Sequence, residues 1–192
     1  MKPYHILNNQ SYLLNDVRGC YEYLTTLYEK CHPDLALKTA VLKIGTEERK
    51  PIQYMFDKYD FLMGYVLIWE LGPGKSIRAH KDGPLSIEQG NPRLIGLNVP
   101  VSGCNESCVT SFYNVDPQDE YVDMAARSRF VKLNSPRTKI DEYRLVDKPV
   151  LIDTQIFHDL DNTKNSEKRV AISWTTTFKT LEEAVKYFNE QE

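Results

Sequence analysis

The chain has 192 residues, 41% of them hydrophobic, and a formal net charge of −3 at pH 7. This length suits one domain with a sizeable core, and the composition is that of a globular protein. The slightly acidic balance gives no general attraction to nucleic acid or to an anionic membrane, so neither is an expected partner. No apolar run approaches the length of a membrane span, and Met1 to His5 show no apolar signal region, so we expect a cytoplasmic protein.

Residues 1–64 are expected to support the fold rather than to carry chemistry. Apolar residues recur at helical spacing over residues 15–31, which predicts an amphipathic helix. Its N-cap would be Asn15 or Asp16, and the chain would leave the helix at His32 and Pro33.

Two shorter elements are predicted before residue 64, a strand over residues 40–44 and a helix over residues 51–59. His5 and His32 have no partner at ligand spacing, so we interpret both as structurally ordinary.

A predicted hairpin follows, with strands at residues 65–71 and 76–80 joined by the turn Gly72-Pro73-Gly74. Alternate residues of a strand point to one face, so His80 and Asp82 can aim at the same point. An imidazole nitrogen and a carboxylate oxygen placed in this way are two of the three ligands of a 2-His-1-carboxylate triad, which holds non-haem Fe(II).

The next two strands are predicted at residues 93–101 and 109–115. Asn98 is the polar residue of the first one, and its face of small and polar residues fits the inside of a barrel that holds a ligand. Asn98 could equally serve only to satisfy backbone groups. In the second strand, Tyr113 or Ser111 could hydrogen-bond a ligand carboxylate, and the alternative for the tyrosine is simple packing.

Residues 116–142 are polar and rich in basic side chains, and they predict a long insertion loop. Such a loop in a compact domain is often a lid or a binding loop, here one that could meet an acidic substrate. The alternative, which we favour, is a solvated surface excursion.

A candidate third ligand, His158, follows the predicted buried strand 148–153 and a turn. Eleven residues later, Arg169 opens the predicted strand 169–178. An arginine entering a β core is rare unless it is paired with an anion, which could be an internal carboxylate such as Asp153 or a bound ligand.

The C-terminal segment Thr180-Leu181-Glu182-Glu183 is a capping box and predicts a final helix. About eight short strands with a helix at each end predict a mainly β fold, a double-stranded β-helix of the jelly-roll or cupin type. We expect a single domain over residues 1–192, with its core at about 65–178.

Four cysteines leave a second kind of metal site to consider. Cys104 and Cys108 are spaced as a pair, but Cys20 and Cys31 lie far away in the predicted helix, whereas structural zinc needs a second pair nearby. Zinc therefore remains an alternative to free thiols, and a disulfide is disfavoured in a reducing compartment.

The pattern His80-x-Asp82, then His158, then Arg169 resembles the Fe(II)/2-oxoglutarate-dependent oxygenase superfamily over about residues 65–178. The segments Arg93–Pro100 and Thr110–Tyr113 are similar to the middle strands of the aspartyl/asparaginyl- and prolyl-hydroxylase-like branches, and the sequence does not choose between these branches.

The resemblance implies a site and a reaction. Iron would bind His80, Asp82 and His158, and 2-oxoglutarate would chelate the iron and place its far carboxylate on Arg169. A guanidinium suits that carboxylate because the hydrogen bonds are charge-assisted and can be bidentate. Ser173, two inward steps beyond Arg169, could assist. With O2 the expected outcome is hydroxylation of a substrate, with release of succinate and CO2.

Two other functions remain open from the sequence. A cupin-type metal enzyme that does not use 2-oxoglutarate would more often bind its metal with three histidines and a glutamate, which this chain supplies poorly. A non-enzymatic β-barrel binding module would use these histidines as ordinary polar residues. The substrate is not disclosed, and a protein side chain, an amino acid and a small metabolite are all open.

Overall fold

The computed structural model describes residues 2–31, 41–83, 93–123 and 128–191. The predictions made for His32 and for residue 40 lie outside these residues. The strands are β1 (Tyr4–Ile6), β2 (Leu42–Lys43), β3 (Leu62–Leu71), β4 (Ser76–Lys81), β5 (Ile95–Ser102), β6 (Val109–Val115), β7 (Glu120–Asp123), β8 (Ser128–Val131), β9 (Arg137–Arg144), β10 (Val150–Asp153), β11 (Phe157–Asp161) and β12 (Arg169–Thr176). The helices are α1 (Ser11–Gly19), α2 (Tyr21–Cys31), α3 (Thr46–Arg49), α4 (Gln53–Lys58) and α5 (Leu181–Asn189), with 3-10 turns at Lys50–Ile52 and Pro117–Asp119.

The strands form two six-stranded antiparallel sheets. Sheet A has the order β1-β10-β5-β12-β3-β2, and sheet B has the order β7-β8-β4-β11-β6-β9. This arrangement confirms the predicted mainly β, jelly-roll type of fold. One detail of the prediction is wrong, because β3 and β4 do not form a hairpin. The chain crosses between the sheets after β3, which pairs with β12, whereas β4 pairs with β11.

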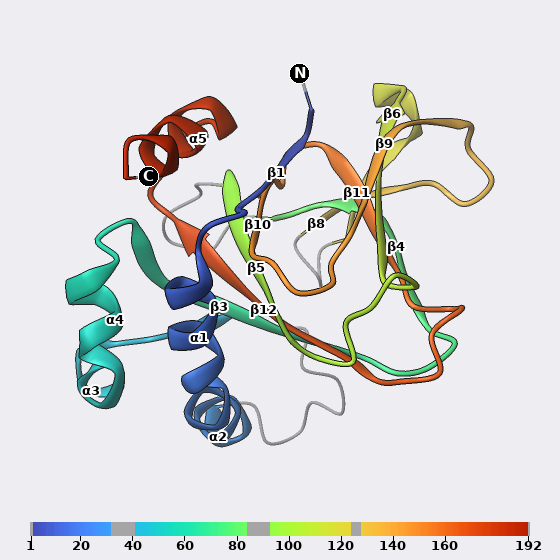
Figure 1. Ribbon diagram of the computed structural model, residues 1–192. Helices are drawn as coiled ribbons and strands as arrows, with labels where there is room; N and C mark the ends of the chain where they lie inside the picture. The colour runs from blue at the N-terminus through green and yellow to red at the C-terminus, as the bar shows by residue number, and fades with distance from the viewer. Residues whose placement is uncertain (1, 32–40, 84–92, 124–127, 192) are drawn as a thin grey trace.

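Sheet A is covered on both faces. Its outer face packs against the helices in the largest apolar cluster, which joins Leu13, Leu24 and Met55 to Ile172 and Trp174. Its inner face meets sheet B in a smaller cluster that contains Ala171 and Phe112. All eight residues of β12 are buried for this reason, which explains the nearly continuous apolar sequence of the central strands. In Figure 1 the helices lie on one side of the molecule and sheet B on the other.

The predicted helix over residues 15–31 is two helices, which meet at Cys20. The amide of Cys20 bonds to the carbonyl of Val17 at 3.2 Å, a tightened last turn that follows the poor helix former Gly19. Asp16 lies inside α1 and caps nothing. Its carboxylate instead accepts hydrogen bonds from Lys58 and Tyr59 at 2.6 and 2.8 Å.

The prediction of an insertion loop over residues 116–142 is wrong for those of its residues that the structure describes. β7 and β8 form a hairpin that extends sheet B beside β4, and β9 begins at Arg137. The sequence of β9 is polar because this edge strand is mostly exposed. Asp159 and Asp161 lie in β11.

The predicted C-terminal helix and its capping box are confirmed. The Thr180 hydroxyl accepts a hydrogen bond from the amide of Glu183 at 3.1 Å, and the Glu183 carboxylate accepts one from the amide of Lys179 at 2.7 Å. Among the described residues, no helix combines the length and the apolar character needed to cross a bilayer.

Candidate metal and co-substrate site

The three predicted metal ligands lie together between the sheets. His80 in β4 and His158 in β11 are direct partners across an antiparallel pair, and Asp82 follows β4 at once. The Oδ1 atom of Asp82 lies 3.6 Å from Nε2 of His80 and 3.9 Å from Nε2 of His158. Neighbouring ligand atoms of an octahedral ion with bonds of about 2.1 Å lie roughly 3 Å apart. A small movement of these side chains toward one another would therefore let all three atoms bind one metal ion. Within the described part of the chain, no other group of three such side chains could hold a metal.

Backbone carbonyls fix the protonation pattern of both imidazoles. Nδ1 of His80 lies 2.9 Å from the carbonyl of Arg78, and Nδ1 of His158 lies 2.9 Å from the carbonyl of Ile156. Because a carbonyl only accepts, each Nδ1 carries the hydrogen and donates it. The lone pair of each Nε2 is therefore free and lies on the side of Asp82, as metal ligation requires.

The electrostatics of His158 and Asp82 favour the protonation states that bind a metal. Burial, helped by the nearby His80 ring, lowers the pKa of His158 to about 4. Burial also acts to raise the pKa of the Asp82 carboxyl, but the positive charge of Arg93 beside it acts in the opposite direction and favours the carboxylate. A carboxylate and neutral imidazoles are the forms that bind a metal cation.

A row of aromatic rings continues from the two histidines across sheet B. The His80 and His158 rings have their centroids 4.6 Å apart. Phe130, the partner of His80 in β8, stacks on it at 5.6 Å, and Phe112, the partner of His158 in β6, lies 6.0 Å from that ring. Tyr121 of β7 stacks on Phe130 at 5.9 Å. The β7–β8 hairpin thus brings an aromatic wall to the metal ligands, which sequence reasoning did not foresee.

Arg169 reaches the same cavity from β12, and no acid among the described residues pairs with it. Its side chain is 2% exposed and lines the cavity with Trp69, His158 and Ser173. Its Nε and Nη1 atoms have no hydrogen-bond partner, and no ion pair joins it to an acid of the described residues, Asp153 included. A buried guanidinium with unused donors is costly unless an anion completes it. The site therefore fits an anionic ligand here.

Ser173 and Asn98, the predicted assisting residues, also line this cavity. They are partners in the β12–β5 register, and the Ser173 hydroxyl donates a hydrogen bond to Oδ1 of Asn98. The Nδ2 group of Asn98 donates to the Tyr143 hydroxyl at 3.0 Å. Both side chains are therefore already bonded within the protein, and their contact with a co-substrate stays a prediction.

Arg93 is the site residue that sequence reasoning missed. It precedes β5, is 2% exposed, and places Nη1 3.1 Å from Oδ2 of Asp82. Its Nη2 donates to the Ser173 hydroxyl at 2.6 Å and to the carbonyl of Trp174 at 3.2 Å. The signal that could have found it is the one that found Arg169, a lone arginine at the start of a buried strand.

Tyr113 does not reach the site. Its neighbour Phe112 pairs with His158 and faces inward, so Tyr113 points to the opposite face of sheet B. There its hydroxyl donates to Asp159 at 2.6 Å, and its ring belongs to the small cluster of Ala79 and Phe157. The predicted role in co-substrate binding is therefore wrong, because alternation fixes which residues share a face but not which face is inside. Ser111, the alternative, shares the face of Tyr113.

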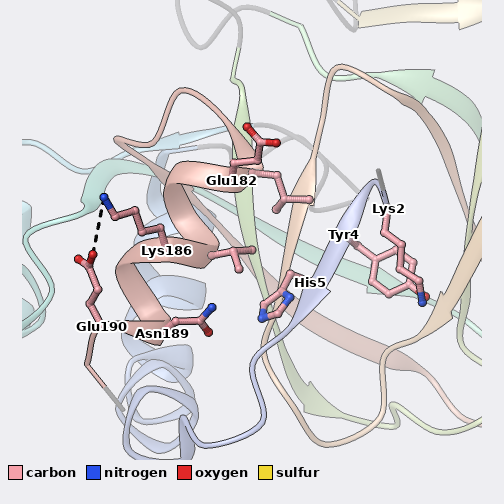
Figure 2. A pocket seen from close by; sticks show the side chains of 9 residues that line it. Lys2, Tyr4, His5, Glu182, Lys186, Asn189 and Glu190 are labelled. Carbon is pink, nitrogen blue, oxygen red and sulfur yellow. Dashed lines mark ion pairs between the residues drawn. The ribbon is translucent and has the colours of Figure 1, made fainter.

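Two further features lie away from this site. A groove of about 510 Å³ runs between β1 and α5 and holds His5, as Figure 2 shows, with the ion pair Lys186–Glu190 at its rim. The four cysteines are free thiols. The buried thiol of Cys108 contacts the side chains of Asn162 and Asn165, both at 3.3 Å.

Comparison with known proteins gives matches in structure only, since no family model and no curated protein matches the chain. The chain is similar to SnoK, a non-heme α-ketoglutarate-dependent carbocyclase from nogalamycin biosynthesis, with a TM-score of 0.53 and 12% identity over 91% of this chain and 80% of that one. It is also similar to a Pseudomonas putida prolyl-4-hydroxylase (TM-score 0.45, 9% identity, 91% and 92% covered). A third similar structure is the 2-oxoglutarate complex of a collagen prolyl hydroxylase from Paramecium Bursaria Chlorella virus-1 (TM-score 0.43, 15% identity, 92% and 97% covered).

At these identities the similarity shows the fold. The chain has the fold of 2-oxoglutarate-dependent oxygenases, as the resemblance of its sequence to that superfamily implied. α-Ketoglutarate and 2-oxoglutarate are the same compound.

Proposed function

We propose that the chain is a non-haem Fe(II)- and 2-oxoglutarate-dependent dioxygenase that hydroxylates its substrate and releases succinate and CO2. The observation that carries this proposal is the pairing of two features in one cavity. One is the group of His80, Asp82 and His158, of which Asp82 and His158 line the cavity, and the other is the buried Arg169, with which no acid of the described residues pairs. A metal site alone would suit many cupin-type enzymes, whereas the arginine requires an anion beside the metal.

His80, Asp82 and His158 would hold the iron through two Nε2 atoms and Oδ1. These ligands occupy three positions and leave the others of an octahedral ion to the co-substrate, water or O2. When bound, Fe(II) supplies the redox chemistry with O2 that couples decarboxylation of the oxo acid to oxidation of the substrate.

The residues of the chain bind and orient the reactants. Arg169 would hold the far carboxylate of 2-oxoglutarate with its two unused donors, and so set the distance between that anchor and the metal ligands. Trp69, Leu160 and Ala171 provide apolar wall around the anchor. Such a wall limits water near the charged groups and strengthens their interaction.

The substrate would approach on the side of the β7–β8 hairpin. Phe130 and Tyr121 there continue the row of rings from His80, and Nη2 of the exposed Arg78 donates to the Tyr121 hydroxyl at 2.9 Å. The substrate proposed is a protein side chain, an amino acid or a small metabolite. The net charge of −3 gives no support to a nucleic acid.

The test is an anaerobic titration with Fe(II) and then with 2-oxoglutarate, followed by the visible metal-to-ligand charge-transfer band. Native protein should develop the band, His158→Ala should not, and His5→Ala should match the native protein because His5 lies in the separate groove between β1 and α5. Iron binding with no band would indicate a cupin-type enzyme that does not use 2-oxoglutarate. Failure to bind iron would indicate a binding module.

A further inference from the structure

We propose that Arg93 is a positioning residue for the metal site, which it serves by holding one oxygen of Asp82 so that the carboxylate binds metal through the other oxygen alone. This inference rests on the proposed function, because it concerns the same metal. Oδ2 of Asp82 lies 3.1 Å from Nη1 of Arg93, whereas Oδ1 lies on the side of the two imidazoles, 3.6 and 3.9 Å from their Nε2 atoms. The two oxygens thus have separate partners.

The guanidinium is itself held in place from several sides. Its Nη2 donates to the hydroxyl of Ser173 and to the carbonyl of Trp174, both in β12. Through Ser173 of β12 it joins Asn98 of β5 and Tyr143 of β9, so Asp82 lies at one end of a hydrogen-bonded chain that runs from sheet A to sheet B. A fork-shaped cation bonded at two nitrogens cannot rotate with the carboxylate, so it fixes the orientation of the carboxylate.

The backbones of Arg93 and Asp82 are also tied to one residue, Thr154. The amide of Asp82 donates to the carbonyl of Thr154 at 3.1 Å, and the hydroxyl of Thr154 donates to the carbonyl of Arg93. Nε2 of Gln155 adds a bond of 2.7 Å to the same Arg93 carbonyl. Arg93 and Asp82 are therefore positioned relative to each other at both the backbone and the side chain.

Gly96 provides the space that the guanidinium occupies. A Cβ atom built on Gly96 would overlap Nη2 of Arg93 and come within 2.8 Å of its Cζ, which real Cβ atoms do not do. A residue with a side chain at position 96 would displace the guanidinium while leaving its charge in the protein. The sequence therefore offers two independent ways to disturb the contact with Asp82.

The test measures Co(II) binding to the full chain by its visible absorption, because the spectrum of this ion reports the number and type of its ligands. In Arg93→Met, Oδ2 of Asp82 loses its partner and becomes available to the metal. We expect a changed Co(II) spectrum and an affinity about 10- to 100-fold weaker, the usual effect of removing a group that orients a metal ligand. Arg93→Lys keeps the positive charge but lacks the planar guanidinium with its several donors. Its affinity for Co(II) should therefore lie between that of Arg93→Met and that of the native protein.

Gly96→Ala covers the case in which Arg93→Met does not fold, and it has a matched control in Gly64→Ala. A Cβ atom on Gly64 would also crowd an arginine, meeting Nη2 of Arg49 at 2.6 Å as well as the backbone oxygen of Ile44 at 2.9 Å, but that arginine stacks on Phe56 in the helical layer. Gly96→Ala should therefore change the Co(II) spectrum and weaken binding, whereas Gly64→Ala should lower only the thermal stability.

The outcomes separate the inference from the proposed function. Native protein that binds Co(II), with Arg93→Met or Gly96→Ala binding it equally well or better and with the same spectrum, overturns the positioning role and leaves the function intact. Native protein that binds neither Co(II) nor Fe(II) overturns both.

Discussion

Arg169→Met should weaken 2-oxoglutarate binding without weakening the fold. The side chain is 2% exposed, and its Nε and Nη1 atoms have no hydrogen-bond partner in the part of the chain that the structure describes. Each hydrogen bond to a charged group contributes about 1.5–3 kcal/mol, so losing the anchor would cost about 3 kcal/mol after partial compensation by water. That cost corresponds to roughly a 100-fold weaker affinity for 2-oxoglutarate.

The same substitution should leave the free energy of unfolding of the co-substrate-free protein unchanged or higher. Methionine is an unbranched apolar side chain, and it removes a buried charge that the protein leaves unpaired. Weaker 2-oxoglutarate binding without a loss of protein stability would identify Arg169 as a ligand-binding residue. Removing an arginine with a purely structural role would instead destabilise the protein.

The assay combines an anaerobic titration of the Fe(II) protein with 2-oxoglutarate and urea unfolding of the metal-free protein. Lys168→Met is the control, since it removes the neighbouring positive charge, whose exposed side chain pairs with Glu70 at 3.1 Å. It should change the free energy of 2-oxoglutarate binding and the free energy of unfolding by no more than about 0–1 kcal/mol, the contribution of a surface ion pair. If Arg169→Met binds 2-oxoglutarate normally and unfolds more easily, the arginine is structural and our reasoning about its missing anion is wrong.

Three further predictions concern single residues. His158→Ala should abolish stoichiometric Fe(II) binding, measured by anaerobic equilibrium dialysis, and retained binding would remove this residue from the site. Tyr113→Phe should leave 2-oxoglutarate affinity unchanged, because the hydroxyl bonds Asp159 on the outer face of sheet B, and a large loss of affinity would restore the role predicted from sequence. Ser173→Ala should lower the free energy of unfolding by about 1–3 kcal/mol in urea, because its hydroxyl bridges Arg93 and Asn98. Unchanged stability would show that this buried network contributes little.

Local patterns in the sequence were sufficient to predict several parts of the site. The side chains of His80 and Asp82 lie on one face because residues two apart on a strand do so whatever the strand pairs with. Arg169 and Ser173 share a face of β12 for the same reason. The capping box before α5 is also local, since its hydrogen bonds join residues at most four apart.

Long-range pairing decided what the sequence could not. The two histidines meet because β11 pairs with β4, and the separate pairing of β11 with β6 places Phe112 beside His158 and turns Tyr113 outward. Exposed strands such as β9 carry polar sequences, so the hydrophobic pattern that reveals buried strands did not mark them.

The sequence by itself thus predicted the fold class and the candidate metal ligands from residue types, their spacing and a period of two along each strand, and its resemblance to the oxygenase superfamily named Arg169 as the candidate co-substrate anchor. Only the tertiary structure decided which face of each strand lies inside and that Arg93 meets Asp82. The physical reason is that register and the direction of a long side chain are set by contacts between segments far apart in the chain.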